Sequence, residues 1–323
     1  MAVGADGSTT GEYDAAVWLS PDGLTWTRVP QQGSLGGPGL QVMEAVTAGG
    51  PGLVAVGEYN ETLFDPHAAV WLSADGVTWT RVDPGVIEGE GAGPAPDLPP
   101  GSGEGAVMHD VTTFGSGLIA VGEADPYTLN AIPAIWVSAN GLAWEQILLD
   151  PGVQGETSHS HADAVAAGPY GVAVAGRIGD RSLFDGTGRS AHGLGAVWMS
   201  EDGIDWRLAA AFEPGPMDEP ADCRYQASTS AVAWSGETLL VGGELRTGCL
   251  TRNTYAAVWA STDAGETWHM IAKEPVEPAP SGGGRTWGPE RLVSDIDTFG
   301  SQTIVVGGIG WSGVAWLGEW PDG

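Results

Sequence analysis

The sequence has few basic residues and no long uninterrupted hydrophobic run. Lys and Arg number 12 against 41 Asp and Glu, so the formal net charge is −29. Charge of this sign repels nucleic-acid phosphates and anionic membrane surfaces, and we expect neither as a partner. No segment reaches the roughly 18 consecutive apolar residues of a membrane-spanning helix. Met1-Ala2-Val3-Gly4 already reads as part of a repeat, so we expect no signal peptide in this chain.

Glycine, proline and tryptophan are abundant instead. The chain of 323 residues contains 52 Gly, 22 Pro and 15 Trp, and 42% of its residues are hydrophobic. Frequent Gly and Pro disfavour long helices and favour turn-rich β structure. The hydrophobic fraction is large enough to bury a core, so the composition indicates a folded all-β protein.

One nine-residue pattern, Trp-x-Ser-x-Asp-Gly-x-x-Trp, recurs along the chain. It begins at Trp18, Trp71, Trp136 (with Asn140 for Asp), Trp198 and, one residue longer, Trp259, and a decayed copy begins at Trp316. Asp-Gly suits a tight turn, whose backbone the Ser and Asp side chains can bind. We therefore interpret these residues as structural: Ser20, Asp22, Trp26, Ser73, Asp75, Trp79, Ser138, Asn140, Trp144, Ser200, Asp202, Trp206, Ser261, Asp263 and Trp268.

A second pattern alternates with the first. It is a β-rich run ending in Gly, as in Leu53–Gly57, and a Val or Ile such as Val46 lies seven residues before each full run. Each repeat then reads as four strands, which we call a, b, c and d, with Ala68–Ser73 as c and Val77–Val82 as d in one copy. Four-stranded units of roughly 40–65 residues predict a β-propeller of antiparallel blades.

The ends of the chain are incomplete in this scheme. We count six b and six c strands, but five a and five complete d strands. We expect six blades in a single domain spanning residues 1–323, with both ends truncated and seven native blades if the chain is a fragment.

The longer turn, Ser261-Thr262-Asp263-Ala264-Gly265-Glu266-Thr267-Trp268, resembles the Asp-box (BNR) repeat, and the other copies resemble a variant shortened by one residue. The resemblance covers nearly the whole chain. Asp-box propellers include sialidases and other glycosidases, sortilin-like receptors and photosystem-assembly factors. The resemblance therefore implies a propeller fold and leaves the function open.

Loop lengths divide the predicted propeller into two faces. The a–b and c–d connections are short, whereas the d–a and b–c connections are long, and in a propeller the long ones share a face. Cys223 and Cys249 fall in long loops of one blade. We hypothesise a disulfide between them, which implies an oxidising, extracellular or cell-surface location; two free thiols are the alternative.

Polar residues recur near the start of the a strands. Glu44, His109, Asp163, Ser230 and Ser294 occupy equivalent positions, and His161 lies two residues before Asp163. Glu58, Glu123 and Arg177 follow the b strands at the same level. We expect these side chains at the mouth of a central channel, where the ligand-binding candidates are Glu44, Glu58, His109, Glu123, His161, Asp163 and Arg177.

Two interpretations of this mouth remain open. Glu44, His109, His161 and Asp163 are candidate ligands of a divalent cation such as calcium or zinc. The alternative is a polar, water-filled channel whose groups bind one another. No catalytic residue is assigned.

Three functions follow from these patterns. The first is a monomeric extracellular propeller that binds a glycan, peptide or protein through its long-loop face. The alternative is a glycoside hydrolase, sialidase-like or acting on a neutral glycan, with two carboxylates at the channel mouth. The Phe/Tyr-Arg-Ile-Pro signature of sialidases is absent, and the acidic charge opposes an anionic substrate. A photosystem-assembly factor ranks last, because no basic patch is found.

Overall fold

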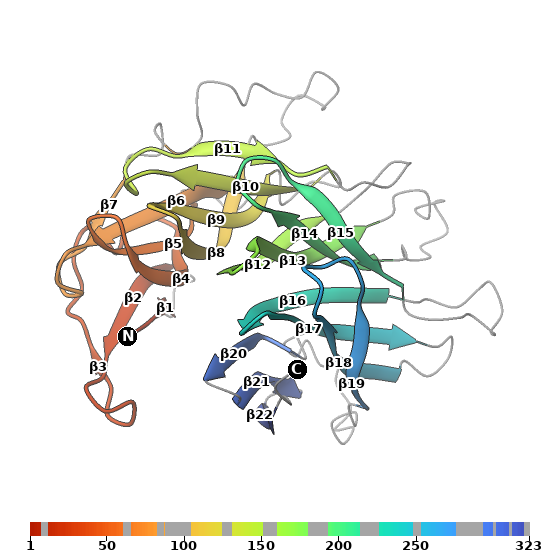
Figure 1. Cartoon of the computed structure of the whole chain (residues 1–323). Coiled ribbons are helices and arrows are strands. Elements are labelled where there is room, and N and C mark those ends of the chain that lie inside the picture. Colours follow the sequence, from red (N-terminus) through yellow and green to blue (C-terminus); the bar gives the residue numbers. More distant parts are fainter. Residues whose placement is uncertain are drawn as a thin grey trace, which may run out of the picture. The chain divides into compact units, whose positions relative to one another are not determined.

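The structure is a computed structural model of the chain. It describes residues 1–7, 12–60, 66–82, 87, 105–124, 131–150, 160–179, 193–213, 226–247, 253–275, 293–299, 302–309 and 312–319. Every regular element within these ranges is a β-strand (Figure 1). The all-β class predicted from the sequence is thereby confirmed. The chain divides into two compact units, residues 1–149 and 150–323, which we describe one at a time.

The first unit contains three antiparallel groups of strands. The first group is β1 (Ala2–Gly7), β2 (Tyr13–Leu19) and β3 (Thr27–Arg28). The second is β4 (Leu40–Gly49), β5 (Gly52–Asn60), β6 (Pro66–Ser73) and β7 (Thr80–Arg81), and one parallel pair, Tyr13–Leu40, joins it to the first. The third is β8 (Ala106–Phe114), β9 (Gly117–Ala124), β10 (Ile132–Ser138) and β11 (Glu145–Leu148).

The second unit repeats this arrangement. Its first group is β12 (His161–Gly168), β13 (Gly171–Gly179), β14 (Gly193–Ser200) and β15 (Arg207–Phe212). The parallel pair Gly193–Gln226 joins it to β16 (Gln226–Ser235), β17 (Thr238–Thr247), β18 (Asn253–Ser261) and β19 (His269–Pro275). The last described group is β20 (Asp295–Phe299), β21 (Gln302–Ile309) and β22 (Ser312–Glu319).

The predicted strand order a-b-c-d is present in four complete groups, whereas the predicted strand limits need correction. The outermost strand is shorter than expected: β7 covers Thr80–Arg81, where the period-two pattern predicted Val77–Val82. The difference arises because residues 74–79 belong to the turn rather than to the strand. Strand b is longer than expected, since β5 continues past Gly57 to Asn60, so Glu58 lies within a strand.

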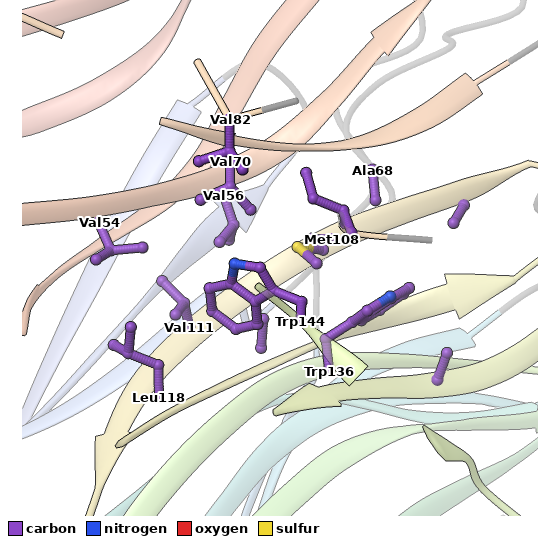
Figure 2. Close-up of a cluster of buried hydrophobic side chains, with 14 residues drawn as sticks. Val54, Val56, Ala68, Val70, Val82, Met108, Val111, Leu118, Trp136 and Trp144 are labelled. Atoms are coloured by element: carbon purple, nitrogen blue, oxygen red, sulfur yellow. The ribbon is translucent and has the colours of Figure 1, made fainter. Parts of the chain in front are cut away.

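Tryptophans fill the space between successive groups of strands. Trp71, Trp136 and Trp198 are each at most 1% exposed. In the first unit β8 packs against β4, β5 and β6. Figure 2 shows Trp136 and Trp144 in this region, with the Trp144 ring beside Val56 and Val111. Burying a side chain of this size supplies much of the packing energy between one group and the next.

The five turns between strands c and d, which contain Asp or Asn followed by Gly, share one hydrogen-bond pattern. In each, the indole N–H of the second Trp donates to the carbonyl of the turn glycine at 3.0–3.2 Å. The Asp75 carboxylate accepts from the backbone N–H groups of Val77 and Thr78 at 2.8 and 2.7 Å. The turn glycines have φ between 72° and 82°, and in the longer fifth turn Ala264 adds a second residue at φ 57°. Side chain and backbone thus close each turn locally.

A β-bulge interrupts four of the a strands at the same place. The bulge residues are Glu44, His109, Asp163 and Ser230, the polar positions aligned from the sequence. Opposite each bulge lies a glycine of strand b. A Cβ on Gly57, Gly122, Gly176 or Gly243 would lie 1.9–2.1 Å from a backbone carbonyl oxygen of strand a. The glycine is therefore required by close backbone approach, and the bulge redirects the polar side chain next to it.

The turn carboxylates predict an acid-dependent loss of stability. The backbone N–H groups of Thr78 and Val77 hold the pKa of Asp75 below its usual value. This contribution is present above the unfolded-state pKa of 3.8 and is lost as the pH falls through the lower folded-state pKa. Asp75→Asn should keep the acceptor, as Asn140 does, and lose this pH dependence. Asp75→Ala should lower the melting temperature more than Asp75→Asn at pH 7. Thermal melts of the three proteins at pH 7 and pH 3 check both points.

The bulge predicts a strict requirement for glycine opposite it. In Gly122→Ala the new Cβ would lie 1.9 Å from the Val107 oxygen. We expect a loss of about 1–3 kcal/mol or more in the free energy of unfolding, measured by urea denaturation. Gly33→Ala is the matched control, because a Cβ there meets no atom within 4 Å. Equal stability of the two variants would contradict the close approach.

Candidate functional site

Four titratable side chains of the first unit gather beside its two bulges. Glu44 and His109 are the bulge residues of β4 and β8. Glu58 on β5 and Glu123 on β9 each follow the glycine that faces a bulge. His109 Nε2 lies 3.6 Å from Glu123 Oε1, and both side chains are more than four-fifths buried. We call these four residues the carboxylate group.

Glu58 is the least well satisfied member of the carboxylate group. Its Oε2 atom is buried and has no hydrogen-bond partner among the described residues. Burial raises the pKa of Glu58, and the negative charges of Glu44 and Glu123 raise it further, whereas His109 lowers it. A carboxyl group in this environment favours its protonated form, which can donate a proton.

The second unit has a concave site of its own residues, which we call the polar pocket. It has a volume of about 190 Å³ and is lined entirely by residues with polar side chains. They come from the first two strands of two neighbouring groups: His161, Asp163, Arg177, Gln226, Ser228, Ser230, Glu244 and Arg246.

Close polar contacts organise the polar pocket. His161 Nε2 lies 3.1 Å from Asp163 Oδ2, and Arg246 Nη2 lies 2.9 Å from Glu244 Oε1. The Gln226 amide, oriented with its oxygen toward Arg177, accepts from both terminal guanidinium nitrogens at 2.9 Å. The Asp163 and Glu244 side chains are only 3% and 8% exposed. These charges are held in place before any ligand arrives.

The structure places the predicted site residues in two sets. Glu44, Glu58, His109 and Glu123 lie together in the first unit, and His161, Asp163 and Arg177 lie together in the second. The predicted cation site draws on both units and stays a prediction. Within the described ranges no three His, Cys, Asp or Glu residues are grouped to hold a metal ion. Cys223 and Cys249 lie outside the described residues, as do most residues of the long loops.

Sequence reasoning missed four residues of the polar pocket. They lie on β16 and β17 and are Gln226, Ser228, Glu244 and Arg246. Glu244 was detectable, because it follows Gly243 as Glu58 follows Gly57, and both glycines face a bulge. Gln226 and Arg246 come together through the cross-strand register of β16 and β17, which the spacing of the motifs does not specify.

The described residues include no helix that is long and apolar enough to cross a membrane.

Comparison with known proteins gives structural similarity without a sequence family. No protein-family model matches the sequence, and no curated protein matches it. A variant of an α-L-arabinofuranosidase from Fusarium graminearum, bound to an iminosugar inhibitor, has a TM-score of 0.50 at 13% identity, over 97% of this chain and 87% of that one. A protein of unknown function from Dyadobacter fermentans has a TM-score of 0.50 at 14% identity, over 85% and 78%. At these identities the similarity concerns the fold alone.

The environment of Glu58 predicts a pH-dependent stability difference. Because the folded state raises its pKa, its contribution to stability is complete below the unfolded-state value of 4.5 and is lost as the pH rises through the folded-state pKa. Glu58→Gln removes this loss. The melting temperature of this variant should therefore rise relative to that of the native protein as the pH increases from 4 to 8. Glu145→Gln changes an exposed residue of the same unit, and its melting temperature should depend on pH as that of the native protein does. Parallel melting curves for all three would contradict the burial of Glu58.

Proposed function

We propose that this protein is a carbohydrate-active β-propeller that hydrolyses glycosidic bonds, with Glu58 as the general acid. The observation that carries the proposal is the partly buried Glu58 carboxyl group, whose buried Oε2 atom has no hydrogen-bond partner among the described residues and which interacts electrostatically with Glu44, His109 and Glu123. Hydrolysis of a glycoside requires one protonated carboxyl group and one ionised carboxylate near the same bond. Within the carboxylate group, burial raises the pKa of Glu58, which suits the role of proton donor, and Glu44 and Glu123 are the neighbouring carboxyl groups for the second role.

The chemistry assigns a role to each member. Glu58 donates its proton to the leaving-group oxygen as the bond to the anomeric carbon breaks. A second carboxylate, Glu44 or Glu123, either attacks that carbon or removes a proton from the attacking water. His109 lies beside Glu123 and, when protonated, offsets part of the negative charge of the group. Proton donation of this kind contributes about 10²–10⁴-fold to a rate.

Fold-level features support the propeller part of the proposal. Four complete antiparallel groups, the repeated Trp-flanked turns and the similarity to the Fusarium graminearum protein fit six blades in a closed ring. The Asp-box resemblance adds membership of that propeller family. A monomer in an extracellular location, with a Cys223–Cys249 disulfide, belongs to the same proposal. Because the similar Fusarium graminearum protein is an α-L-arabinofuranosidase variant, a pentofuranoside is the first substrate to test.

A panel of aryl glycosides tests hydrolysis, beginning with 4-nitrophenyl α-L-arabinofuranoside. Glu58→Gln should lower kcat by about 10²–10⁴-fold. The loss should be much smaller with a 2,4-dinitrophenyl leaving group, which departs without a proton. Glu44→Gln and Glu123→Gln identify the second carboxylate, because its loss slows both substrates. Glu145→Gln should keep the native rate.

Two results would overturn the proposal. One is the absence of turnover across the panel by protein with a native melting curve. The other is turnover that is insensitive to Glu58→Gln. Sugar binding without turnover would instead favour the first function predicted from the sequence, a propeller that recognises a glycan.

A further inference from the structure

We infer that the polar pocket of the second unit binds one neutral sugar ring through its hydroxyl groups and discriminates against charged sugars. The choice of a sugar rests on the proposed function. The preference for a neutral one follows from the charges and contacts of the polar pocket itself.

The strand register brings the polar side chains of the pocket to one end of β12–β13 and β16–β17. Cross-strand pairs join His161 to Arg177, Gln226 to Arg246 and Ser228 to Glu244. The bulge in β12 turns Asp163 toward the same end.

Thr229, which is fully buried, holds the two groups of strands together beside the pocket. Its hydroxyl oxygen lies 2.7 and 2.8 Å from the carbonyl oxygens of Gly176 and Ala196, which share its one proton as acceptors, and it accepts from the Gly176 N–H at 3.0 Å. The pocket walls are therefore fixed by hydrogen bonds between the strands.

The charges of the polar pocket are balanced. Two guanidinium groups, Arg177 and Arg246, face two carboxylates, Asp163 and Glu244. Each already has a polar contact within the pocket: Arg177 with Gln226, Arg246 with Glu244, and Asp163 with His161. An anionic ligand would meet two buried carboxylates and a cationic ligand two guanidinium groups, so a net charge of either sign is unfavourable.

Hydroxyl groups match this arrangement. A hydroxyl donates to a carboxylate and accepts from a guanidinium, so it can join both without replacing an ion pair. With about 190 Å³, the polar pocket is smaller than the roughly 300–1,000 Å³ typical of drug-sized ligands. The size and the alternation of donors and acceptors therefore fit one pentose or hexose ring.

The test measures the binding of four sugars to the whole chain by calorimetry and ligand-observed NMR. L-arabinose and D-galactose are the neutral probes, D-glucuronate the anionic one and D-glucosamine the cationic one. We expect dissociation constants on the order of millimolar for the neutral probes and at least about tenfold weaker binding of the charged ones. Binding is measured on the native protein and on Glu58→Gln.

Variants locate the binding in the polar pocket. Asp163→Asn and Ser228→Ala should each weaken binding of the neutral probes by about tenfold or more. Ser228→Ala breaks none of the pocket's ion pairs. This variant therefore still locates the binding if Asp163→Asn fails to fold. Asp297→Asn changes an exposed residue of β20 in the same unit and should bind as the native protein does.

Three outcomes would overturn the inference: no binding of a neutral probe up to about 100 mM, tighter binding of glucuronate or glucosamine, or native affinity in both pocket variants. Hydrolysis of aryl glycosides without such binding would overturn this inference alone. Binding with native affinity in Glu58→Gln, together with an absence of turnover by the native protein, would support it and overturn the proposed hydrolysis.

Discussion

The close approach of a strand-a carbonyl to a strand-b glycine is the constraint on which the rest of the described structure depends. It recurs at Gly57, Gly122, Gly176 and Gly243, where no Cβ fits. Each contact accompanies a bulge that adds one residue to strand a and redirects a side chain. The fold thereby places a polar residue at the same point of four successive groups without disturbing the apolar pairs that follow it.

The two candidate sites are variations on this one device. In the first unit the bulge residues are Glu44 and His109, and the residues after the facing glycines are both glutamates, so negative charge concentrates around Glu58. In the second unit the bulge residues are Asp163 and Ser230, and the corresponding positions hold Arg177 and Glu244, so the charges balance. The same backbone therefore yields both the group that we propose for proton transfer and the pocket that we propose for a neutral, polar ligand.

The opposite ends of the strands are closed by local hydrogen bonds. There the Asp-Gly turns bind their own backbone, and the indole of the second Trp closes each turn. These carboxylates are fully exposed and have lowered pKa values, about 2 for Asp263, the reverse of the condition of Glu58. A carboxylate that accepts several N–H hydrogen bonds stays ionised and is unsuited to donating a proton near neutral pH.

The sequence by itself determined the all-β class, the four-strand repeat and the positions of the turns, because each depends on contacts between residues close together in the chain. Asp75 binds Val77 and Thr78, and Trp79 binds Gly76. The sequence also aligned four polar residues, because each lies at a fixed distance before a β-rich run that ends in Gly. They are Glu44, His109, Asp163 and Ser230. Only the tertiary structure showed that these are bulge residues, that Glu58 has a buried oxygen with no partner among the described residues, and that Gln226 and Arg246 complete a pocket with His161 and Asp163. Those features depend on cross-strand register and on burial, which local spacing in the sequence does not specify. In the polar pocket the fold brings together residues that lie more than 60 positions apart in the chain.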